Sequence, residues 1–333
     1  MNMFDLCALG ELIIDFTPAG ITNTGVPMFA CYPGGAPGNV AACISKLGKK
    51  TSYIGMVGKD QFGKFLTQTL EDIGVDVNGI ITTSTYNTTL AFVHLDSSGD
   101  RSFSFYRKPS ADIMLDKKDV NLEIIDNAKV FHFGSVSMTD SPARDATLYA
   151  AHYAKTKGKL VSYDPNLRQN LWTDLQEAND YICEGLKYAN IVKLAEEELE
   201  FLTHTNDLIA GSLALIQQYD LKVILTTLGE NGALCVTPSF HFFSPAFKVE
   251  VKDTNGAGDA FTGGFLYHLL SNGKNIDRLT QGELEQCVIF ANATGALTTT
   301  GSGAIPSLPI LATVEEFIKK HHRNKQSLLF NFE

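Results

Sequence analysis

Residues 253–265 read Asp-Thr-Asn-Gly-Ala-Gly-Asp-Ala-Phe-Thr-Gly-Gly-Phe. Phe261, Phe265 and Leu269 recur four residues apart, which is the spacing of one face of an amphipathic helix. The preceding residues 243–251 are mostly apolar and are expected to be extended. The stretch therefore predicts a strand, a glycine turn and the N-terminus of a helix. Backbone N–H groups at such a terminus have no partner within the helix and form a site for an anion.

The residues at this helix start also suggest a chemistry. Gly256 and Gly258 carry no Cβ, so an anion can approach their amides and that of Ala257 closely. Asp259 follows directly, and it is placed to take a proton from a hydroxyl that attacks a phosphoryl group held by those amides. A glycine-rich turn, with Asp259 favoured by the helix dipole, would explain the same residues without a function.

The composition is that of a globular protein with a large core. The 333 residues are 44% hydrophobic, and the net charge of −10 argues against a nucleic-acid partner, which would favour a basic surface. The six cysteines form no C-x-x-C pair, and most of them are expected to be reduced core residues, which favours the cytoplasm. The N-terminus lacks a basic region typical of a signal peptide, and we expect no membrane partner because no apolar run has the length of a span.

Strands and helices alternate along most of the chain. We expect strands at residues 6–14, 51–57, 130–133, 160–163, 191–194, 223–227 and 233–236, and helices after the glycines of 34–48 and at 60–73, 142–157, 196–202 and 207–219. This alternation predicts an α/β fold, with a mostly parallel sheet covered by helices on both faces. Residues 80–108 instead alternate polar and aromatic side chains around a turn at 97–100, which predicts a half-exposed hairpin. We expect one α/β domain over residues 1–333, with a small β lid from about 15–33 and 80–110.

A second glycine-rich segment, residues 33–41, reads Pro-Gly-Gly-Ala-Pro-Gly-Asn-Val-Ala. Its glycines and prolines predict a rigid loop with little steric obstruction, and Asn39 is expected to cap or open the helix that follows. The amides of Gly34 and Gly35, together with the Asn39 side chain, could bind sugar hydroxyls. An ordinary strand-to-helix turn is the alternative interpretation.

Charged side chains follow two of the predicted strands. Asp15 comes after residues 6–14, and Arg168 comes shortly after residues 160–163. The carboxyl ends of strands face the crevice in which α/β sheets bind ligands. The Asp15 carboxylate could accept hydrogen bonds from two adjacent hydroxyls, and Arg168 could reach the sugar or a phosphate. A turn aspartate and a structural ion pair of Arg168 remain open as alternatives.

Segments 33–41 and 253–265 resemble the N-terminal and C-terminal signatures of the ribokinase-like (PfkB) family of sugar kinases, and the resemblance extends over nearly the whole chain. It implies a ribokinase-like fold and ATP with Mg²⁺ as cofactors. It also implies that Asp259 is the catalytic base, that the amides of Gly256, Ala257 and Gly258 form the anion hole, and that Asp15 binds the sugar. There is no P-loop motif and no dinucleotide fingerprint.

The resemblance also implies a nucleotide side and cation sites. Lys193 stands where many relatives have Asn and would contact the nucleotide phosphates, while Glu196, or a neighbouring glutamate, would organise magnesium-bound water. The residues implied at the nucleotide are Thr226, Gly229 and Gly232 in a loop and Asn292 in a helix of small residues. Carbonyl groups near Asp253 and Asn255 would hold K⁺, although Asn255 stands where many relatives have Thr.

Within the family, the segment from Asp164 to Arg168 and the residue Arg107 resemble fructokinases and their ketodeoxygluconate-kinase relatives. We therefore expect ATP-dependent phosphorylation of D-fructose to fructose 6-phosphate, with Arg107 at the sugar. The runner-up is a sugar-acid kinase that uses Arg107 and Arg168, followed by a nucleoside kinase or a non-catalytic sugar-binding regulator. Phe103 and Phe105 are expected to cover the sugar or to pair with a second subunit in a homodimer through the lid.

Overall fold

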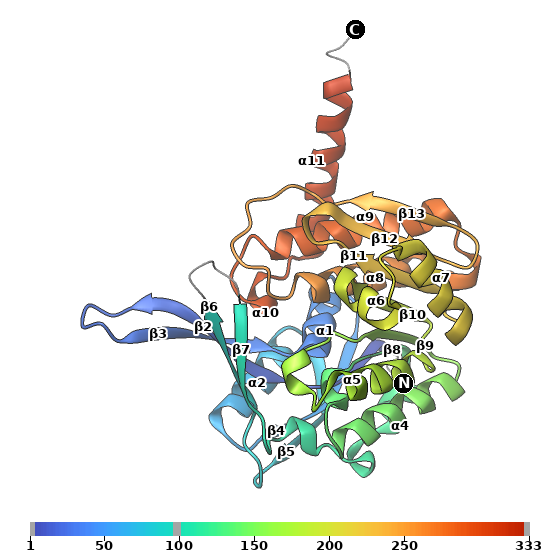
Figure 1. The fold of residues 1–333 in the computed structure, drawn as a ribbon. Helices are drawn as coiled ribbons and strands as arrows, with labels where there is room; N and C mark the ends of the chain where they lie inside the picture. The colour runs from blue at the N-terminus through green and yellow to red at the C-terminus, as the bar shows by residue number, and fades with distance from the viewer. Residues whose placement is uncertain (1–3, 96–100, 330–333) are drawn as a thin grey trace.

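The computed structural model describes residues 4–95 and 101–329, which form a nine-stranded sheet, a separate four-stranded sheet and the helices around them (Figure 1). The strand order of the large sheet is β13 (His241–Pro245), β12 (Gly232–Val236), β11 (Val223–Thr227), β10 (Ile191–Ala195), β9 (Leu160–Asp164), β8 (Ala128–Gly134), β1 (Phe4–Leu9), β4 (Thr51–Gly58) and β5 (Val75–Thr83). Neighbouring strands are parallel, except that β12 pairs antiparallel with both β11 and β13. The predicted mostly parallel sheet is confirmed.

The large sheet separates two hydrophobic cores. Side chains of a strand alternate between the two faces of its sheet. In β1, Leu6 and Ala8 accordingly pack in one core. Cys7 and Leu9 pack in the other. Both faces of the central strand are therefore buried, which explains its nearly continuous apolar sequence.

Helices cover both faces of the large sheet, as predicted. The core that contains Leu6 includes side chains of α1 (Ala36–Lys46), α2 (Gln61–Asp72), α8 (Ala257–Asn272), α9 (Gln281–Thr298), α10 (Ala304–Ser307) and α11 (Leu311–Leu329). The core that contains Cys7 includes side chains of α3 (Leu122–Asp126), α4 (Ala143–Thr156), α5 (Leu175–Leu186), α6 (Glu196–Thr203) and α7 (Leu208–Tyr219). No helix within the described part of the chain is long and apolar enough to cross a membrane.

The prediction of one strand over residues 6–14 is wrong. β1 ends at Leu9, and the chain leaves the large sheet before β2 (Ile13–Ile21) begins in the small sheet. The chain packs tightly against α1 where it leaves, since a Cβ on Gly10 would lie 2.5 Å from Cγ of Pro37. Asp15 is consequently the third residue of a strand in the small sheet, and does not lie at the carboxyl end of a strand of the large one.

The small sheet has the strand order β3 (Pro27–Gly34), β2, β6 (Leu90–Leu95) and β7 (Arg101–Tyr106). β2 and β3 form a long hairpin that extends away from the large sheet (Figure 1). The hairpin predicted within 80–108 corresponds to β6 and β7, but residues 80–83 belong to β5 of the large sheet. The predicted turn at 97–100 and the side chain of Phe103 lie outside the described residues.

The helix predicted after the glycine turn is α8. Gly256 precedes it and Gly273 follows it, with φ angles of 77° and 65° in the left-handed region that glycine adopts without strain. The strand expected over 243–251 is wrong in its extent, because β13 ends at Pro245 and the chain is irregular from there to Gly256. This irregular segment joins the edge strand of the large sheet to the N-terminus of α8.

Candidate active site

A cavity lies where the small sheet meets the N-termini of α1 and α8. Its walls come from segments that are far apart in sequence, and its lining residues are Glu11, Ile13, Asp15, Gly35, Ala36, Asn39, Phe105, Val136, Asn166, Arg168, Leu171, Asn255, Gly256, Asp259 and Ala304. The structure thus brings together most of the residues predicted at the sugar and the predicted base. Phe105 of β7 is among them, so the small sheet forms part of the wall.

Asp259 is the third residue of α8, and its side chain is largely buried, with 8% of the residue exposed. Nδ2 of Asn39 donates a hydrogen bond of 2.7 Å to Oδ2 of Asp259, which joins the two glycine-rich segments directly. The prediction that Asn39 caps or opens α1 is wrong, because the helix begins at Ala36 and Gly35 precedes it. Asn39 instead lies one turn inside α1, where its side chain faces α8.

The environment of Asp259 favours its protonated form. The pKa of this carboxyl is raised from 3.8 to about 6 overall, because burial and the nearby Asp164 carboxylate raise it more than Asn39, Lys193 and Arg168 lower it. A carboxyl with a pKa just below neutral pH is deprotonated under physiological conditions and still binds a proton well. Asp259 therefore combines the position and the basicity that a general base needs.

The turn before Asp259 is shaped for an anion. Gly256 adopts a left-handed conformation, and a Cβ there would lie 2.5 Å from Cβ of Ala304. A Cβ on Gly258 would lie 3.1 Å from Nζ of Lys193. The Lys193 ammonium is therefore next to the first turn of α8, where it adds positive charge to the unpaired amides.

Lys193 belongs to a buried charge cluster beside the turn. Its Nζ lies 3.3 Å from Oδ2 of Asp164, and both side chains are almost fully buried. Burial acts to lower the pKa of Lys193, but the carboxylates of Asp164, Glu198 and Asp259 outweigh it and raise the pKa. Lys193 consequently stays charged within the cluster.

Glu198 is a functional candidate that the sequence interpretation did not select. It is buried, and its two carboxyl oxygens accept hydrogen bonds from the backbone N–H groups of Leu167 at 2.6 Å and Ala195 at 2.7 Å. Glu196, the predicted magnesium residue, lies two positions earlier on the exposed side of the first turn of α6. Successive residues of a helix are rotated by about 100° around its axis, so only one of Glu196, Glu197 and Glu198 faces the charge cluster. The apolar Leu199 next to Glu198 indicates that Glu198 is the one on the buried side.

Asp15 lies against Gly34, since a Cβ on Gly34 would be 2.2 Å from Oδ2 of Asp15. Burial raises the pKa of the Asp15 carboxyl to about 7. Arg168 acts to lower that pKa, while Asp259 and Asp253 raise it. Asp15 and Arg168 therefore line the cavity together with Asp259, and Gly34 packs against the Asp15 carboxyl.

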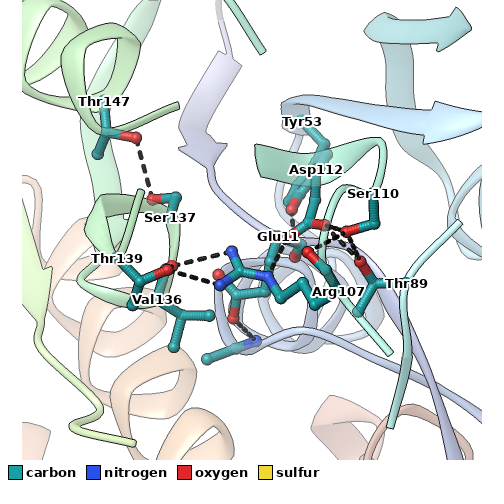
Figure 2. A network of polar contacts seen from close by, with 11 residues as sticks. Glu11, Tyr53, Thr89, Arg107, Ser110, Asp112, Val136, Ser137, Thr139 and Thr147 are labelled. Atoms are coloured by element: carbon teal, nitrogen blue, oxygen red, sulfur yellow. Dashed lines mark hydrogen bonds and ion pairs between the residues drawn. The ribbon is translucent and has the colours of Figure 1, made fainter. Parts of the chain in front are cut away.

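Arg107 is not among the residues that line this cavity. It is buried behind the wall, where its Nε contacts Asp112 at 2.8 Å and its terminal nitrogens donate to Oγ1 of Thr139 at 2.6 Å and to the carbonyl of Val136 at 3.0 Å (Figure 2). Val136 does line the cavity, so Arg107 supports the wall from behind. The sequence around Arg107 does not distinguish a residue behind the cavity wall from a residue that contacts the sugar directly.

Two further lining residues were not selected from the sequence. Glu11 lies between β1 and β2. Asn166 has a left-handed φ of 54°, and Asn tolerates that conformation better than most residues. Non-glycine residues with positive φ cluster at functional sites, but the conformation becomes visible only in the structure.

The residues predicted at the nucleotide lie around the ends of β11 to β13. Gly232 has a φ of 124°, and a Cβ there would lie 2.1 Å from the carbonyl oxygen of Ser244. Nδ2 of Asn292 donates to the same oxygen at 3.1 Å, so Gly232 and Asn292 meet at Ser244. Gly229 opens an exposed turn after β11, whereas Thr226 is fully buried within that strand.

Asp253 fastens the loop that precedes the glycine turn. Its Oδ1 accepts a hydrogen bond from the backbone N–H of Asn255, and its Oδ2 accepts one from that of Gly303, both at 2.9 Å. A Cβ on Gly303 would lie 2.4 Å from the ring of Tyr32 in β3, so this loop also touches the small sheet. Within residues 4–95 and 101–329, no three His, Cys, Asp or Glu side chains are grouped as they would be around a metal ion.

A model of the pfkB family of carbohydrate kinases matches residues 3–311 of the chain. The chain belongs to this family. It is 43% identical over 315 residues to fructokinase-1 of Zea mays, an alignment that covers 94% of this chain and 97% of the relative. This level of similarity over nearly the full length confirms the predicted family and the carbohydrate-kinase activity that defines it.

Solved structures of fructokinases have the same fold as this pfkB chain. The ATP-bound fructokinase of Xylella fastidiosa superposes with a TM-score of 0.89 at 34% identity, covering 96% of this chain and 100% of that one. The fructokinase of Vibrio cholerae O395 with fructose, ADP and calcium superposes with a TM-score of 0.85 at 35% identity, covering 96% and 100%. A double mutant of the Vibrio protein holds fructose, ADP and potassium, with the same TM-score and identity and with 96% and 99% covered. The predicted ribokinase-like fold is confirmed.

Proposed function

We propose that this protein is an ATP-dependent fructokinase that transfers the γ-phosphoryl group of Mg-ATP to the primary hydroxyl of D-fructose, giving fructose 6-phosphate. The observation that carries the reaction type is the buried carboxylate of Asp259 at the N-terminus of α8, beside the unpaired amides of the glycine turn. The choice of sugar is supported by the fructokinases to which the chain is similar.

In this proposal Asp259 accepts the proton of the attacking hydroxyl. The amides of Gly256, Ala257 and Gly258 then hold the negative charge that develops on the transferred phosphoryl group. Phosphoryl transfer depends mainly on positioning and on electrostatic stabilisation. A site made of helix-terminal amides, one base and the adjacent Lys193 ammonium supplies both.

The sugar would bind between Asp15 and Asn39. Oδ1 of Asn39 is buried and has no hydrogen-bond partner among the described residues, so it can accept a hydrogen bond from a sugar hydroxyl. The carboxylate of Asp15 would accept hydrogen bonds from two adjacent hydroxyls, and the amides at Gly34 and Gly35 and the side chain of Arg168 would complete the site. Phe105 of the small sheet would cover the sugar, and we propose that this sheet acts as the lid of a single kinase domain.

ATP would lie on the side of β10 to β13, with its phosphates directed towards the Lys193 ammonium. Gly229 has open space around it and would leave room for the nucleotide, whereas Gly232 packs against the backbone of Ser244, which Asn292 also holds in place. Thr226 is fully buried within β11, so it would support the nucleotide side from inside that strand.

Mg²⁺ keeps several waters and binds mainly through substrate phosphates in sites of this kind. It would neutralise phosphate charge when bound with ATP. We propose Glu198 rather than Glu196 as the glutamate that orients its waters, because Glu198 is buried next to Lys193 and Glu196 is exposed. Both oxygens of Glu198 already accept backbone hydrogen bonds, which fits a role through water better than direct coordination.

K⁺ would bind beside the loop of Asp253 and Asn255. Both carboxyl oxygens of Asp253 accept backbone hydrogen bonds, so Asp253 shapes the loop and backbone carbonyl groups are the better candidates for ligands. The bound cation would add positive charge next to the anion hole. A titration of turnover with KCl at constant ionic strength, with NaCl as the balancing salt, tests this proposal.

The sugar-acid alternative relied on Arg107 and Arg168. The Arg107 guanidinium is bonded to Asp112, Thr139 and Val136 and Arg107 does not line the cavity, so that alternative retains only Arg168. The nucleoside-kinase and regulator alternatives have less support, because the fructokinases to which this chain is similar extend over almost its full length.

We also propose a cytoplasmic homodimer that pairs through the small sheet. The side chains of Ile21, Val26, Met28 and Phe29 on the β2–β3 hairpin are 41–67% exposed, which favours a partner surface. All six cysteines are free, and most of them are buried, which suits a reducing compartment. Sedimentation of the purified protein tests the dimer.

The test of the proposed function is ADP release from Mg-ATP with fructose, 2-keto-3-deoxygluconate, ribose, tagatose and adenosine. A fructokinase gives the highest kcat/KM with fructose. A higher value with the sugar acid would retain the kinase chemistry and overturn the substrate. Saturable sugar binding without ADP release from any of these compounds would favour the regulator.

A further inference from the structure

We propose that Glu11 binds the sugar directly and helps this kinase to select an uncharged ketose over a sugar acid. This inference rests on the proposed fructokinase function. Glu11 lies in the segment that leads from β1 of the large sheet to β2 of the small one, and it lines the same cavity as Asp15, Asn39 and Asp259. None of the roles assigned above involves it.

One oxygen of the Glu11 carboxyl is bonded and the other is available. Oε1 accepts a hydrogen bond of 2.9 Å from the backbone N–H of Ala36, the first residue of α1. Oε2 is buried and has no hydrogen-bond partner among the described residues. A buried polar atom without a partner costs about 1–3 kcal/mol. A sugar hydroxyl in the cavity would supply the missing donor.

The backbone around Glu11 is held from three directions. The hydroxyl of Tyr53 donates a hydrogen bond of 2.7 Å to the Glu11 carbonyl. A Cβ on Gly35 would lie 2.3 Å from the same carbonyl, and a Cβ on Gly10 would lie 2.5 Å from Pro37. Close packing of this kind fixes the position of the carboxyl before a ligand arrives, which reduces the entropy lost on binding.

The charges behind Glu11 do not neutralise it by a direct contact. The Arg107 guanidinium lowers the pKa of Glu11 and Asp112 raises it, but burial is the largest influence and raises the pKa to about 7. The Arg107 side chain donates hydrogen bonds to Asp112, Thr139 and Val136, and Asp112 also accepts hydrogen bonds from Ser110 and Thr89 (Figure 2).

Arg107 and Asp112 therefore compensate each other, and Glu11 adds its own negative charge above neutral pH. Together with Asp15 and Asp259, three carboxyl groups line the cavity, against the single guanidinium of Arg168. A substrate with a carboxylate would be repelled by this wall, whereas the hydroxyls of a neutral sugar can donate hydrogen bonds to it.

The test compares Glu11→Gln with the wild type at about pH 8, where the Glu11 carboxyl is mostly charged. Glutamine retains the size of the side chain and an acceptor for the Ala36 N–H, but removes the charge and one acceptor. The exposed helix residue Glu71 provides a control, Glu71→Gln. KM and kcat are measured for fructose, 2-keto-3-deoxygluconate and ATP, and fructose binding without ATP is measured by calorimetry.

We expect Glu11→Gln to weaken fructose binding by about 10-fold or more, the scale of a hydrogen bond to a charged group. The KM for ATP should stay unchanged, and the preference for fructose over the sugar acid should fall. Unchanged fructose binding and an unchanged preference would overturn the proposal. Equal losses for both sugars and for ATP, with a lower melting temperature, would also overturn it in favour of a structural role.

If Glu11→Gln does not fold, Glu11→Asp takes its place, because it retains the charge but withdraws the carboxyl by one methylene. The same weakening of fructose binding with an unchanged KM for ATP is expected, and unchanged fructose binding overturns the proposal. The wild-type sugar panel distinguishes the two hypotheses. A wild type that does not use fructose contradicts the proposed function, whereas a fructose-specific wild type with a silent Glu11 variant contradicts only this inference.

Discussion

Asp259→Asn should make the ligand-free protein more stable and nearly inactive at the same time. Burial and the Asp164 carboxylate raise the pKa of Asp259 from 3.8 to about 6. A shift of about two pKa units corresponds to about 3 kcal/mol of unfavourable free energy for the charged carboxylate in the folded state. The residue is only 8% exposed, so solvent screens little of this effect. Asparagine removes the charge and retains an acceptor for Nδ2 of Asn39.

The stability that Asp259→Asn gains over the wild type should increase with pH. Because the folded pKa of Asp259 is raised, the native state binds more protons than the unfolded state between about pH 4 and pH 6, and wild-type stability falls as the pH rises through that window. The Asn variant lacks this loss. Its advantage should therefore be about 3 kcal/mol at pH 8, roughly half of that at pH 5, and close to zero below about pH 4.

Urea unfolding at these pH values measures the difference, and Asp72→Asn on the exposed end of α2 is the matched control that should show no such trend. In parallel, kcat of Asp259→Asn should fall by at least about 100-fold, the scale of losing a general base, while fructose binding persists. An Asn variant that is no more stable than the wild type at pH 8 would refute the electrostatic reasoning. Near-normal turnover would refute the assignment of the base.

Three further predictions concern the same site. The kcat at saturating fructose should fall about 10-fold per pH unit below about pH 6, because Asp259 acts only when deprotonated, and a profile that is flat down to pH 5 would contradict this. Gly256→Ala places a Cβ on a left-handed residue in a crowded turn and should abolish turnover. Gly273 is equally left-handed but lies in open space, so Gly273→Ala should cost only about 1 kcal/mol of stability. Equal turnover of the two variants would contradict this prediction. Lys193→Met leaves Asp164 buried without its cation, which should lower the free energy of unfolding by about 3–5 kcal/mol. It should also move the pH profile of turnover to higher pH, because Lys193 lowers the pKa of Asp259, and an unshifted profile would argue against a coupling between Lys193 and the base.

The regular elements were predictable because their signals are local. The helix predicted at 60–73 is α2, with Asp60 as its N-cap and Ile73 as its C-cap. The helix predicted at 142–157 is α4, flanked by Pro142 and Lys157. The turn at Gly256 and the cap at Gly273 follow from the conformational freedom of glycine, which depends little on distant parts of the fold.

The first strand was mispredicted because an apolar run does not reveal where a chain changes sheets. Residues 6–14 are uniformly apolar apart from Gly10 and Glu11, yet β1 and β2 belong to different sheets. The glycine is the only local sign of the change, and the close approach of Pro37 explains it only afterwards. The same change of sheet places Glu11 at the cavity.

The placement of charged side chains depends on tertiary packing and could be predicted only in part. Asp259 and Asn39 were both assigned to the site, but their direct hydrogen bond, between residues 220 positions apart, requires the fold. Glu196 and Glu198 have the same chemistry and differ only in the direction they face on α6. Arg107 does not line the cavity, and three specific contacts that no sequence pattern encodes hold it in place.

The most direct test of the proposed reaction is to identify the product that the wild-type protein forms from fructose and Mg-ATP by phosphorus–proton correlation NMR. We expect stoichiometric ADP and a single phosphomonoester coupled to the protons on carbon 6 of fructose. A phosphate on another carbon would contradict the proposed placement of the primary hydroxyl at Asp259. ATP that remains unconsumed in the presence of fructose would contradict the proposed fructokinase activity itself.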